Sequence, residues 1–252
     1  MATGVASRLF RARFRQILML EIAAPMAVRR HVSFCEAIHD QTMAVEGIEA
    51  VRASEDYEVL EAWRTEKIAV RVDPNGESIR RCKADILVDA TVAKRNLGTT
   101  IAQAPLVIAL GPGFVAGKDC HIVVETNRGH NLGTLITEGM AEANTGIPGN
   151  IGGFTNERVL RSPSDGLFIA VRQIGDLVRK GDVIGRVGDA EVTAQIDGII
   201  RGLIRPNFHV TTRLKIGDID PRGNRSYCDT ISDKARSIGG AVLEAILATY
   251  NL

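Results

Sequence analysis

The clearest hydrophobic pattern in the chain lies between Asp85 and His130. Three short runs rich in Val, Ile and Leu occur there, at Ile86–Val88, Leu106–Leu110 and Ile122–Val124. Each run is too short for a helix of ordinary length, and each is typical of a strand that is buried on both faces of a parallel sheet. Because ligands of open α/β sheets bind beyond the carboxyl ends of the strands, we expect the functional site where these runs end.

The segments that follow the three runs carry glycines, amides and cations. Glycine lets a backbone pass close to a ligand because it accepts positive φ, although tight turns alone are an alternative explanation for Gly111 and Gly113. A helix predicted at Leu132–Thr137 would add free N–H groups beside Arg128, an arrangement that suits a phosphate or a carboxylate. The predicted ligand-binding residues are Lys94, Asn96, Gly98, Gly111, Gly113, Lys118, Asn127, Arg128 and Gly129.

Three residues of the same stretch are candidates for chemistry. His130 suits an acid or a base near neutral pH, and Glu125 is a second candidate for that role. Glu125 and Asp119 would also bind sugar hydroxyls or a metal ion. A single histidine at a helix start also occurs in purely structural roles, so the sequence assigns no catalytic residue beyond these candidates.

The pattern before Asp85 alternates between helical and extended periods. The expected elements are helices at Thr3–Arg13, Ser33–His39 and Glu55–Trp63 and strands at Gln16–Ile22, Val45–Val51 and Lys67–Val72. In the third helix, Tyr57, Leu60 and Trp63 have the spacing of a buried face. Strands that alternate with helices indicate a sheet with helical crossovers, so we expect residues 1–150 to form a Rossmann-like α/β domain.

Five charged residues outside the central stretch are candidates for contacts with an anion or a ribose. Glu21 ends a predicted strand, where an acid takes ribose hydroxyls in dinucleotide-binding units, but it also suits a solvated strand end. Arg29 and Arg30 precede a predicted helix, either as an anion site or in a solvated loop. Arg222 and Lys234 would line the crevice if the C-terminal helix packs on the sheet, and a solvated face is the alternative.

The pattern changes after a glycine-rich segment at Gly139–Gly153, which predicts a domain boundary. Beyond it, short strands punctuated by glycine form two similar halves. A DG pair at 165–166 recurs at 197–198, and an IG pair at 184–185 recurs at 216–217. A helix is predicted at Ser232–Leu247, with Ser232 as its cap. We therefore expect a second domain at 151–252, with a β module at about 160–220 and the C-terminal helix packing back.

One turn of this β module, Ile174–Asp182, resembles that of biotinyl and lipoyl carrier domains, which have the barrel-sandwich hybrid fold. In those domains the modified lysine lies on the hairpin between the two halves. The corresponding segment here, Arg186–Ala194, contains no lysine, and Lys180 lies in the earlier turn. The resemblance therefore implies the fold and argues against a carrier function.

Composition narrows the classes of partner. The net charge is +1 and aromatic residues make up 4% of the chain, which argues against nucleic acid and an anionic membrane surface. The uncharged stretch Asn96–Gly117 contains four glycines and two prolines, so we do not expect it to span a membrane. Four cysteines without a CxxC pair indicate a reducing compartment and a cytoplasmic protein, with a transit peptide at the basic N-terminus as the alternative. Asp218, Asp220 and Asn224 form only an incomplete calcium loop, so we predict no metal site.

Several longer segments point to one family. They are AVRRHVSFCEAI, DILVDATVAKRNLGT, VIALGPGFVAGKDCHIVVETNRGHNLG, NTGIPGNIGG, KIGDIDPR and SDKARSIGGAVLEAIL. Over nearly the whole chain they resemble the selenium-dependent molybdenum hydroxylase system proteins, which are accessory proteins found with the maturation machinery of molybdenum hydroxylases. The family pattern opens with a strand and a glycine-rich turn before an ATG segment. This chain begins at Met1-Ala2-Thr3-Gly4, so we expect the first strand of the Rossmann-like sheet to be missing.

The resemblance implies an accessory protein that works with a molybdenum hydroxylase or its maturation proteins, and it implies no particular reaction. Together with the cations and glycines of the candidate crevice, it leads us to expect a small anionic ligand, either a nucleotide or a molybdopterin-type cofactor. Two alternatives stay open, a nucleotide-dependent oxidoreductase or transferase and a non-catalytic protein-binding scaffold for the hydroxylase. A homo-oligomer is a candidate state that the sequence does not decide.

Overall fold

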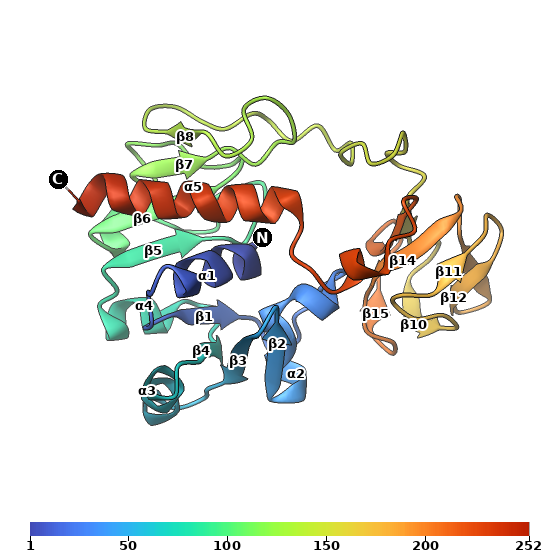
Figure 1. The fold of residues 1–252 in the computed structure, drawn as a ribbon, viewed down its shortest axis with the longest axis horizontal. Coiled ribbons are helices and arrows are strands. Elements are labelled where there is room, and N and C mark those ends of the chain that lie inside the picture. The colour runs from blue at the N-terminus through green and yellow to red at the C-terminus, as the bar shows by residue number, and fades with distance from the viewer. Residues whose placement is uncertain (252) are drawn as a thin grey trace. The chain divides into compact units, whose positions relative to one another are not determined.

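The computed structural model describes residues 1–251 as a mixed α/β protein with several sheets and a long C-terminal helix (Figure 1). The chain forms two compact units. The first comprises Met1–Ala23, Ala50–Thr145 and Ile231–Leu252, and the second comprises Ala24–Glu49 and Gly146–Thr230. No helix within residues 1–251 is both long and apolar enough to cross a membrane.

Parallel strands built around β4 form the first sheet of the first unit. The elements here are α1 (Ala2–Arg11), β1 (Leu18–Glu21), β3 (Ile48–Arg52), α3 (Asp56–Arg64), β4 (Ile68–Val72) and α4 (Glu77–Cys82). Strands β1 and β3 both pair with β4 in parallel, so that Leu18 and Val51 lie on either side of Ala69. The strands predicted at Gln16–Ile22 and Lys67–Val72 are confirmed, with shorter bounds.

Helix α3 forms as predicted, but its buried face is different. Tyr57 and Leu60 are 70% and 60% exposed, whereas Val59 and Ala62 are buried. The prediction was therefore wrong about Tyr57 and Leu60, because the smaller side chains of Val59 and Ala62 form the buried cluster with Ala69 of β4 and with Ala53, which follows β3. Trp63 packs at the edge of the same cluster, and its indole Nε1 donates to the carbonyl of Ile17 at 3.0 Å.

The three apolar runs form a second sheet in the first unit, as predicted. Strands β5 (Ile86–Asp89), β6 (Leu106–Leu110) and β7 (Ile122–Val124) are parallel neighbours, and the short β8 (Leu135–Ile136) pairs with β7 in the antiparallel direction. A 3₁₀ turn at Ile101–Gln103 precedes β6. The five residues of β6 are all buried, which explains their uninterrupted apolar pattern.

The helix predicted at Leu132–Thr137 is absent, and strand β8 takes its place. Gly133 has φ +87°, which ends any helical path, and its N–H donates to the carbonyl of Glu125 at 2.9 Å. The N–H of Glu125 in turn donates to Thr134 at 2.9 Å. These bonds extend the pairing of β7 and β8, so tertiary pairing overrides the local helical pattern.

Helices α1 and α5 (Asp233–Tyr250) lie side by side against this sheet (Figure 1). Ser232 caps α5 as predicted, since its hydroxyl accepts from the N–H of Ala235 at 3.3 Å. The buried residues that the helices share with β6 and β7 are Val5, Leu9, Leu106, Ile108, Leu110, Ile122, Val124, Ile238, Ala241, Val242, Ala245 and Ile246. Helix α5 therefore packs back on this sheet and is part of the first unit.

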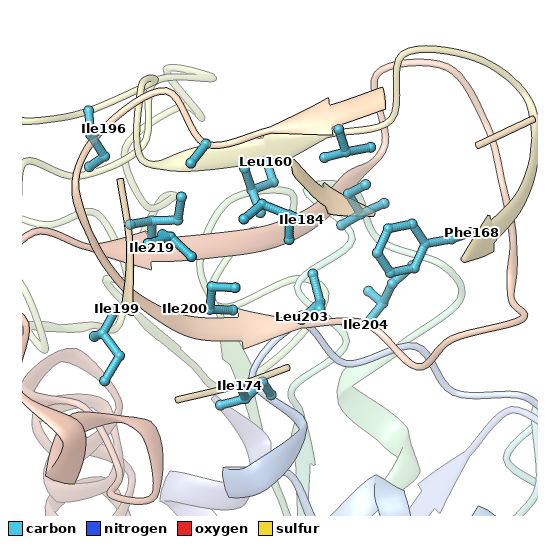
Figure 2. Packing of buried hydrophobic residues seen from close by; sticks show 14 of the residues in the cluster. Leu160, Phe168, Ile174, Ile184, Ile196, Ile199, Ile200, Leu203, Ile204 and Ile219 are labelled. Carbon is cyan, nitrogen blue, oxygen red and sulfur yellow. The ribbon is translucent and has the colours of Figure 1, made fainter. Parts of the chain in front are cut away.

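Two antiparallel sheets form the second unit. Their strands are β9 (Val159–Arg161), β10 (Gly166–Ala170), β11 (Leu177–Val178), β12 (Val183–Val187), β13 (Ala190–Thr193), β14 (Gly198–Leu203), β15 (His209–Val210) and β16 (Lys215–Asp220). One sheet has the order β13-β12-β10-β15 and the other β11-β14-β16-β9. Side chains of both sheets, including Phe168, Ile184, Ile200 and Ile219, meet in one apolar cluster (Figure 2).

The segment Ala24–Glu49 belongs to the second unit, although the sequence placed it in a domain at 1–150. It contains 3₁₀ turns at 30–32 and 34–36, helix α2 (Ala37–Asp40) and strand β2 (Thr42–Val45) in place of the single helix predicted at Ser33–His39. A turn with positive φ at Glu46 and Gly47 splits the strand predicted at 45–51 into β2 and β3. Long-range contacts hold the segment in place: Val28 packs against the apolar cluster, and Arg205 pairs with Glu36.

Candidate functional site

Three loops meet at the carboxyl ends of β5, β6 and β7. Gly113, in the loop after β6, has φ +107°, and a Cβ placed on it would lie 2.5 Å from the Cα of Arg95 in the loop after β5. Gly111 has φ +80°, and its Cβ would lie 2.4 Å from Thr126 Oγ1, just beyond β7. Side chains at these two positions would therefore collide with both neighbouring loops. Glycine is required at both positions for two reasons: the backbone has positive φ, and a neighbouring loop leaves no room for a Cβ.

Polar side chains organise the loop after β5 from within. Asp89, 9% exposed, accepts from the N–H and hydroxyl of Thr91 at 3.0 and 2.7 Å and from the hydroxyl of Thr99 at 2.5 Å. The side-chain oxygen of Asn96 accepts from the N–H groups of Gly98 and Thr99 at 2.8 and 2.7 Å. Asn96 Nδ2 donates to the carbonyl of Thr99 at 2.8 Å. The amide of Asn96, predicted to bind a ligand, is thus engaged in shaping its own loop.

The same loop contains backbone strain. Val92 has φ +53° and Lys94 has φ +64°. A β-branched residue in the left-handed region is a genuine outlier, because its side chain crowds the following carbonyl. The carbonyl carbon of Lys94 lies 2.8 Å from the position that a Cβ on Gly113 would occupy. Strain of this kind is concentrated at ligand sites and persists only where the surroundings impose it.

Glu125 is buried and holds together the loop after β7. Its carboxylate accepts from the N–H of Asn127 at 2.6 Å through one oxygen and from the N–H of Glu142 at 2.7 Å through the other. Each oxygen of Glu125 is thus engaged with one backbone N–H, so the carboxylate holds its loop in place. Glu142 accepts from the side-chain amides of Asn127 and Asn131 at 2.6 and 3.3 Å, and these bonds lower the pKa of its carboxyl.

Arg128 forms a bidentate ion pair with Asp233 in the first turn of α5, with nitrogen–oxygen distances of 2.6 and 2.9 Å. A carboxylate at a helix N-terminus is favoured by the helix dipole. The anion site expected from a helix start beyond Gly129 was a wrong prediction, because a turn and β8 follow instead. His130 and Lys94 are exposed at this edge. Lys118 is exposed in the segment that leads into β7, where Asp119 accepts from the N–H of Val115 at 2.9 Å.

The other candidate contacts do not all belong to this edge. Glu21 ends β1 in the first sheet, where burial raises the pKa of its carboxyl. Arg29 and Arg30 lie in the second unit and donate to backbone carbonyls, Arg29 to Tyr227 and Thr230 at 2.7 and 2.9 Å. Burial lowers the pKa of Arg29 to about 10.

Arg222 also lies in the second unit, where its Nη2 is 2.7 Å from Asp220 Oδ2. Lys234 follows Asp233 in the first turn of α5. The structure therefore brings the loops that carry Lys94 and Arg128 to one sheet edge, and it places Arg29, Arg30 and Arg222 in another unit. Lys118 was wrongly predicted to join them, because the chain after β6 returns to the amino end of β7 before it reaches this residue.

Sequence reasoning missed a buried charge network in the second unit. Arg201 Nε lies 2.9 Å from Asp218 Oδ2, Arg201 Nη1 lies 3.1 Å from Asp220 Oδ2, and Arg158 also pairs with Asp218. Asp218 and Asp220, considered above as calcium ligands, are 1% and 0% exposed and are taken up by these arginines. The sequence did contain a signal for this network. Asp218 and Asp220 flank Ile219 in a predicted strand, and charges buried in a β module must be paired.

No protein-family model matches the chain. Over 246 residues it is 48% identical to the Uncharacterized protein YqeB of Escherichia coli (strain K12), which covers 98% of this chain and 45% of that protein. The chain therefore spans less than half the length of that relative.

Similarity to solved structures is partial. The product-bound ectoine utilization protein EutE (DoeB) from Ruegeria pomeroyi matches 33% of this chain and 27% of its own, with a TM-score of 0.24 and 20% identity. An aspartoacylase family protein from Mesorhizobium loti matches 34% of this chain and 27% of its own, with a TM-score of 0.24 and 19% identity. With TM-scores this low, neither similarity says anything about the function of this chain.

Proposed function

We propose that this chain is an accessory protein of a selenium-dependent molybdenum hydroxylase system that binds a nucleotide- or pterin-like anionic group during cofactor maturation. The resemblance of its longer segments to that family supports the system. The meeting of three loops at Gly111 and Gly113 supports the binding site and is the observation that carries the proposal. In fold terms, parallel strands with helical cover support a Rossmann-like first unit. Two antiparallel sheets around one core support a barrel-sandwich second unit.

The charges at this edge suit an anion. Lys94 contributes a cation from the loop after β5, and Arg128 contributes one from the loop after β7. Arg128 is held in a fixed orientation by Asp233, and a guanidinium binds phosphate with the same two-pronged geometry that it uses for a carboxylate. An incoming phosphate would exchange with Asp233 for Arg128. Binding would thereby be transmitted to the first turn of α5.

A binding screen with charge variants tests this proposal. Purified protein would be screened by thermal shift against NAD(P), ATP, CTP, GTP and molybdopterin dinucleotides. A ligand present at 100 times its Kd adds about 2.7 kcal/mol to the stability of the folded state. Arg128→Ala and Lys94→Ala should each abolish the shift, and Arg172→Ala, an exposed arginine of the second unit, should retain it. If no ligand shifts the protein, or if both variants respond like the wild type, the site is wrong.

A non-catalytic scaffold is a second candidate, and one observation favours it. Leu167 and Ile169 are 37% and 45% exposed on β10, where they flank the buried Phe168, and Val171, just beyond the strand, is 59% exposed. Leu167 and Ile169 share one face of the strand, and an exposed apolar row of this kind marks surfaces that bind other proteins. Under this reading, Ile169→Asp would abolish co-purification with the hydroxylase whereas Arg128→Ala would leave the complex intact. The converse pattern would favour the ligand-binding role.

A further inference from the structure

A small cavity lies between α1 and the start of α5. It has a volume of about 80 Å³ and is lined by Gly4, Ser7, Arg8, Arg11, Ile231 and Arg236. All six residues belong to the first unit, and none of them forms part of the β5–β7 edge described above. Half of the lining residues are arginines, which is an unusual concentration of one charge around so small a space.

The close crossing of the two helices explains why the arginines converge. A Cβ placed on Gly239 would lie 2.7 Å from the carbonyl oxygen of Gly4, and a Cβ on Gly4 would lie 2.7 Å from the carbonyl oxygen of Ala235. The backbones therefore touch where both helices have small residues. Arg8 follows one turn after Gly4, and Arg236 immediately follows Ala235, so the side chains next to the crossing are cationic.

The cavity also has an unsatisfied hydroxyl in its wall. Ser7 is 1% exposed, and its Oγ has no hydrogen-bond partner within residues 1–251. A buried hydroxyl without a partner is destabilising, whereas the same hydroxyl is useful if a bound group accepts from it. Arg236 also lines the cavity, and its Nε donates to the carbonyl of Ile231 at 3.1 Å.

The surrounding charges favour an anion. The chain has no acidic residue before Glu21, and the six residues that line the cavity include no acidic side chain. The guanidinium of Arg8 makes no ion pair or hydrogen bond within the described part of the chain. Cations that line one cavity repel each other, and a bound anion offsets this repulsion by attracting all of them.

We propose that this cavity binds a single phosphate-sized oxyanion, held by Arg8, Arg11 and Arg236 and by the hydroxyl of Ser7. One water needs about 10–15 Å³ of cavity volume, so the space accommodates a group of several heavy atoms and excludes a whole dinucleotide. The ligand is either free phosphate or the terminal phosphate of a larger molecule that remains mostly outside. This site extends beyond the proposed function, since it shares no residue with the β5–β7 edge.

Calorimetric titration with inorganic phosphate, against chloride at equal ionic strength, tests the site. Arg8→Gln and Arg236→Gln should each weaken phosphate binding at least tenfold, because each removes a charge-assisted hydrogen bond. Arg13→Gln is the matched control: it lies just beyond α1, removes the same charge and does not line the cavity. Far-UV circular dichroism verifies that each variant folds.

Ser7→Ala separates ligand binding from a structural role. Removal of an unsatisfied buried hydroxyl should leave the phosphate-free protein as stable as the wild type or more stable, and it should weaken phosphate binding several-fold. Tighter binding of adenosine monophosphate than of phosphate, lost in Arg8→Gln, would identify a phosphorylated ligand, and equal binding would identify free phosphate. The proposal is overturned if phosphate binds no better than chloride, or if Arg13→Gln weakens binding as much as Arg8→Gln does.

Discussion

One arginine cluster of the second unit and one arginine of the first unit use the same side chain in opposite ways. In the second unit, Arg158 and Arg201 are 7% and 11% exposed and pair with Asp218, whose side chain is 2% exposed. In the first unit, Arg128 is 32% exposed and pairs with Asp233, which is 72% exposed. A buried pair cannot be opened without a large cost, whereas an exposed pair can exchange its partner for a ligand. Burial, more than residue type, therefore separates structural arginines from candidate binding arginines.

The largest expected effect is in the buried network. Asp218→Ala leaves Arg158 and Arg201 without their shared carboxylate, and we expect it to cost about 3–5 kcal/mol of unfolding free energy. Urea unfolding followed by far-UV circular dichroism measures this loss. Glu191→Ala is the control in the same unit, because its pair with Arg186 is exposed and should be worth less than about 1 kcal/mol. Equal losses in the two variants would remove the contrast between buried and exposed pairs.

A second effect concerns the glycines at the sheet edge. Gly113→Ala adds strain from positive φ and a collision with the backbone of Arg95, so we expect a loss of about 2–3 kcal/mol and displacement of the loop after β5. Gly139→Ala is the matched control, since Gly139 has φ +89° and nothing lies within 4 Å of its added Cβ. It should lose only about 1 kcal/mol. Hydrogen exchange over 90–100 should rise in the first variant alone.

Much of this edge was predictable from the sequence, because apolar runs and glycines are local signals. The bounds of β6 and β7 match the predicted runs, and Ser232 caps α5 as expected. The residues that were misplaced depend on distant partners. The attachment of Ala24–Glu49 to the second unit rests on contacts such as Arg205 with Glu36, far apart in the sequence. No periodicity in the chain contains that information.

The candidate site was predictable in position and less so in chemistry. The parallel order of β5, β6 and β7 places their loops together whatever the residues in them. The engagement of Asn96 with its own loop and of Glu125 with two N–H groups could not be seen, because short-range polar partners are chosen by the final turn geometry. The helix predicted at Leu132–Thr137 was lost for a different reason, because the pairing of β8 with β7 overrode the local pattern.

Two carboxyl groups at strand ends, Asp220 in the second unit and Glu21 in the first, should change stability with pH in opposite directions. Burial raises the pKa of Asp220, but the hydrogen bonds from Arg222 and the nearby charge of Arg201 outweigh it, so the net pKa is lowered. Its contribution to stability is present above the unfolded value of about 3.9 and is lost as the pH falls through the folded value. We expect Asp220→Asn to cost about 1.5 kcal/mol at pH 7, and the cost should vanish in acid.

Glu21 should show the opposite pH dependence. Burial raises its pKa, so its contribution is present below the unfolded value of about 4.3 and is lost as the pH rises through the folded value. Glu21→Gln should therefore raise the Tm at pH 7 and have no effect at pH 3. Differential scanning calorimetry of both variants between pH 3 and pH 8 measures the two trends. If Glu21→Gln stabilised the protein equally at pH 3, the raised pKa of Glu21 would not be the cause of the effect.

The smallest expected effect on stability is at the exposed pair of Arg128 and Asp233, and it is the one most closely tied to function. A double-mutant cycle with alanine at both positions should give a coupling free energy of about 0.5 kcal/mol, because solvent screens the pair. Glu61 and Arg64 on α3, 55% and 73% exposed, give the comparison value for a pair without any proposed ligand. Loss of Arg128 should then abolish ligand binding at the β5–β7 edge while it barely changes the Tm. A coupling above about 2 kcal/mol would place Arg128 with Arg158 and Arg201 as a structural arginine, because an anion would not displace so strongly bound a partner.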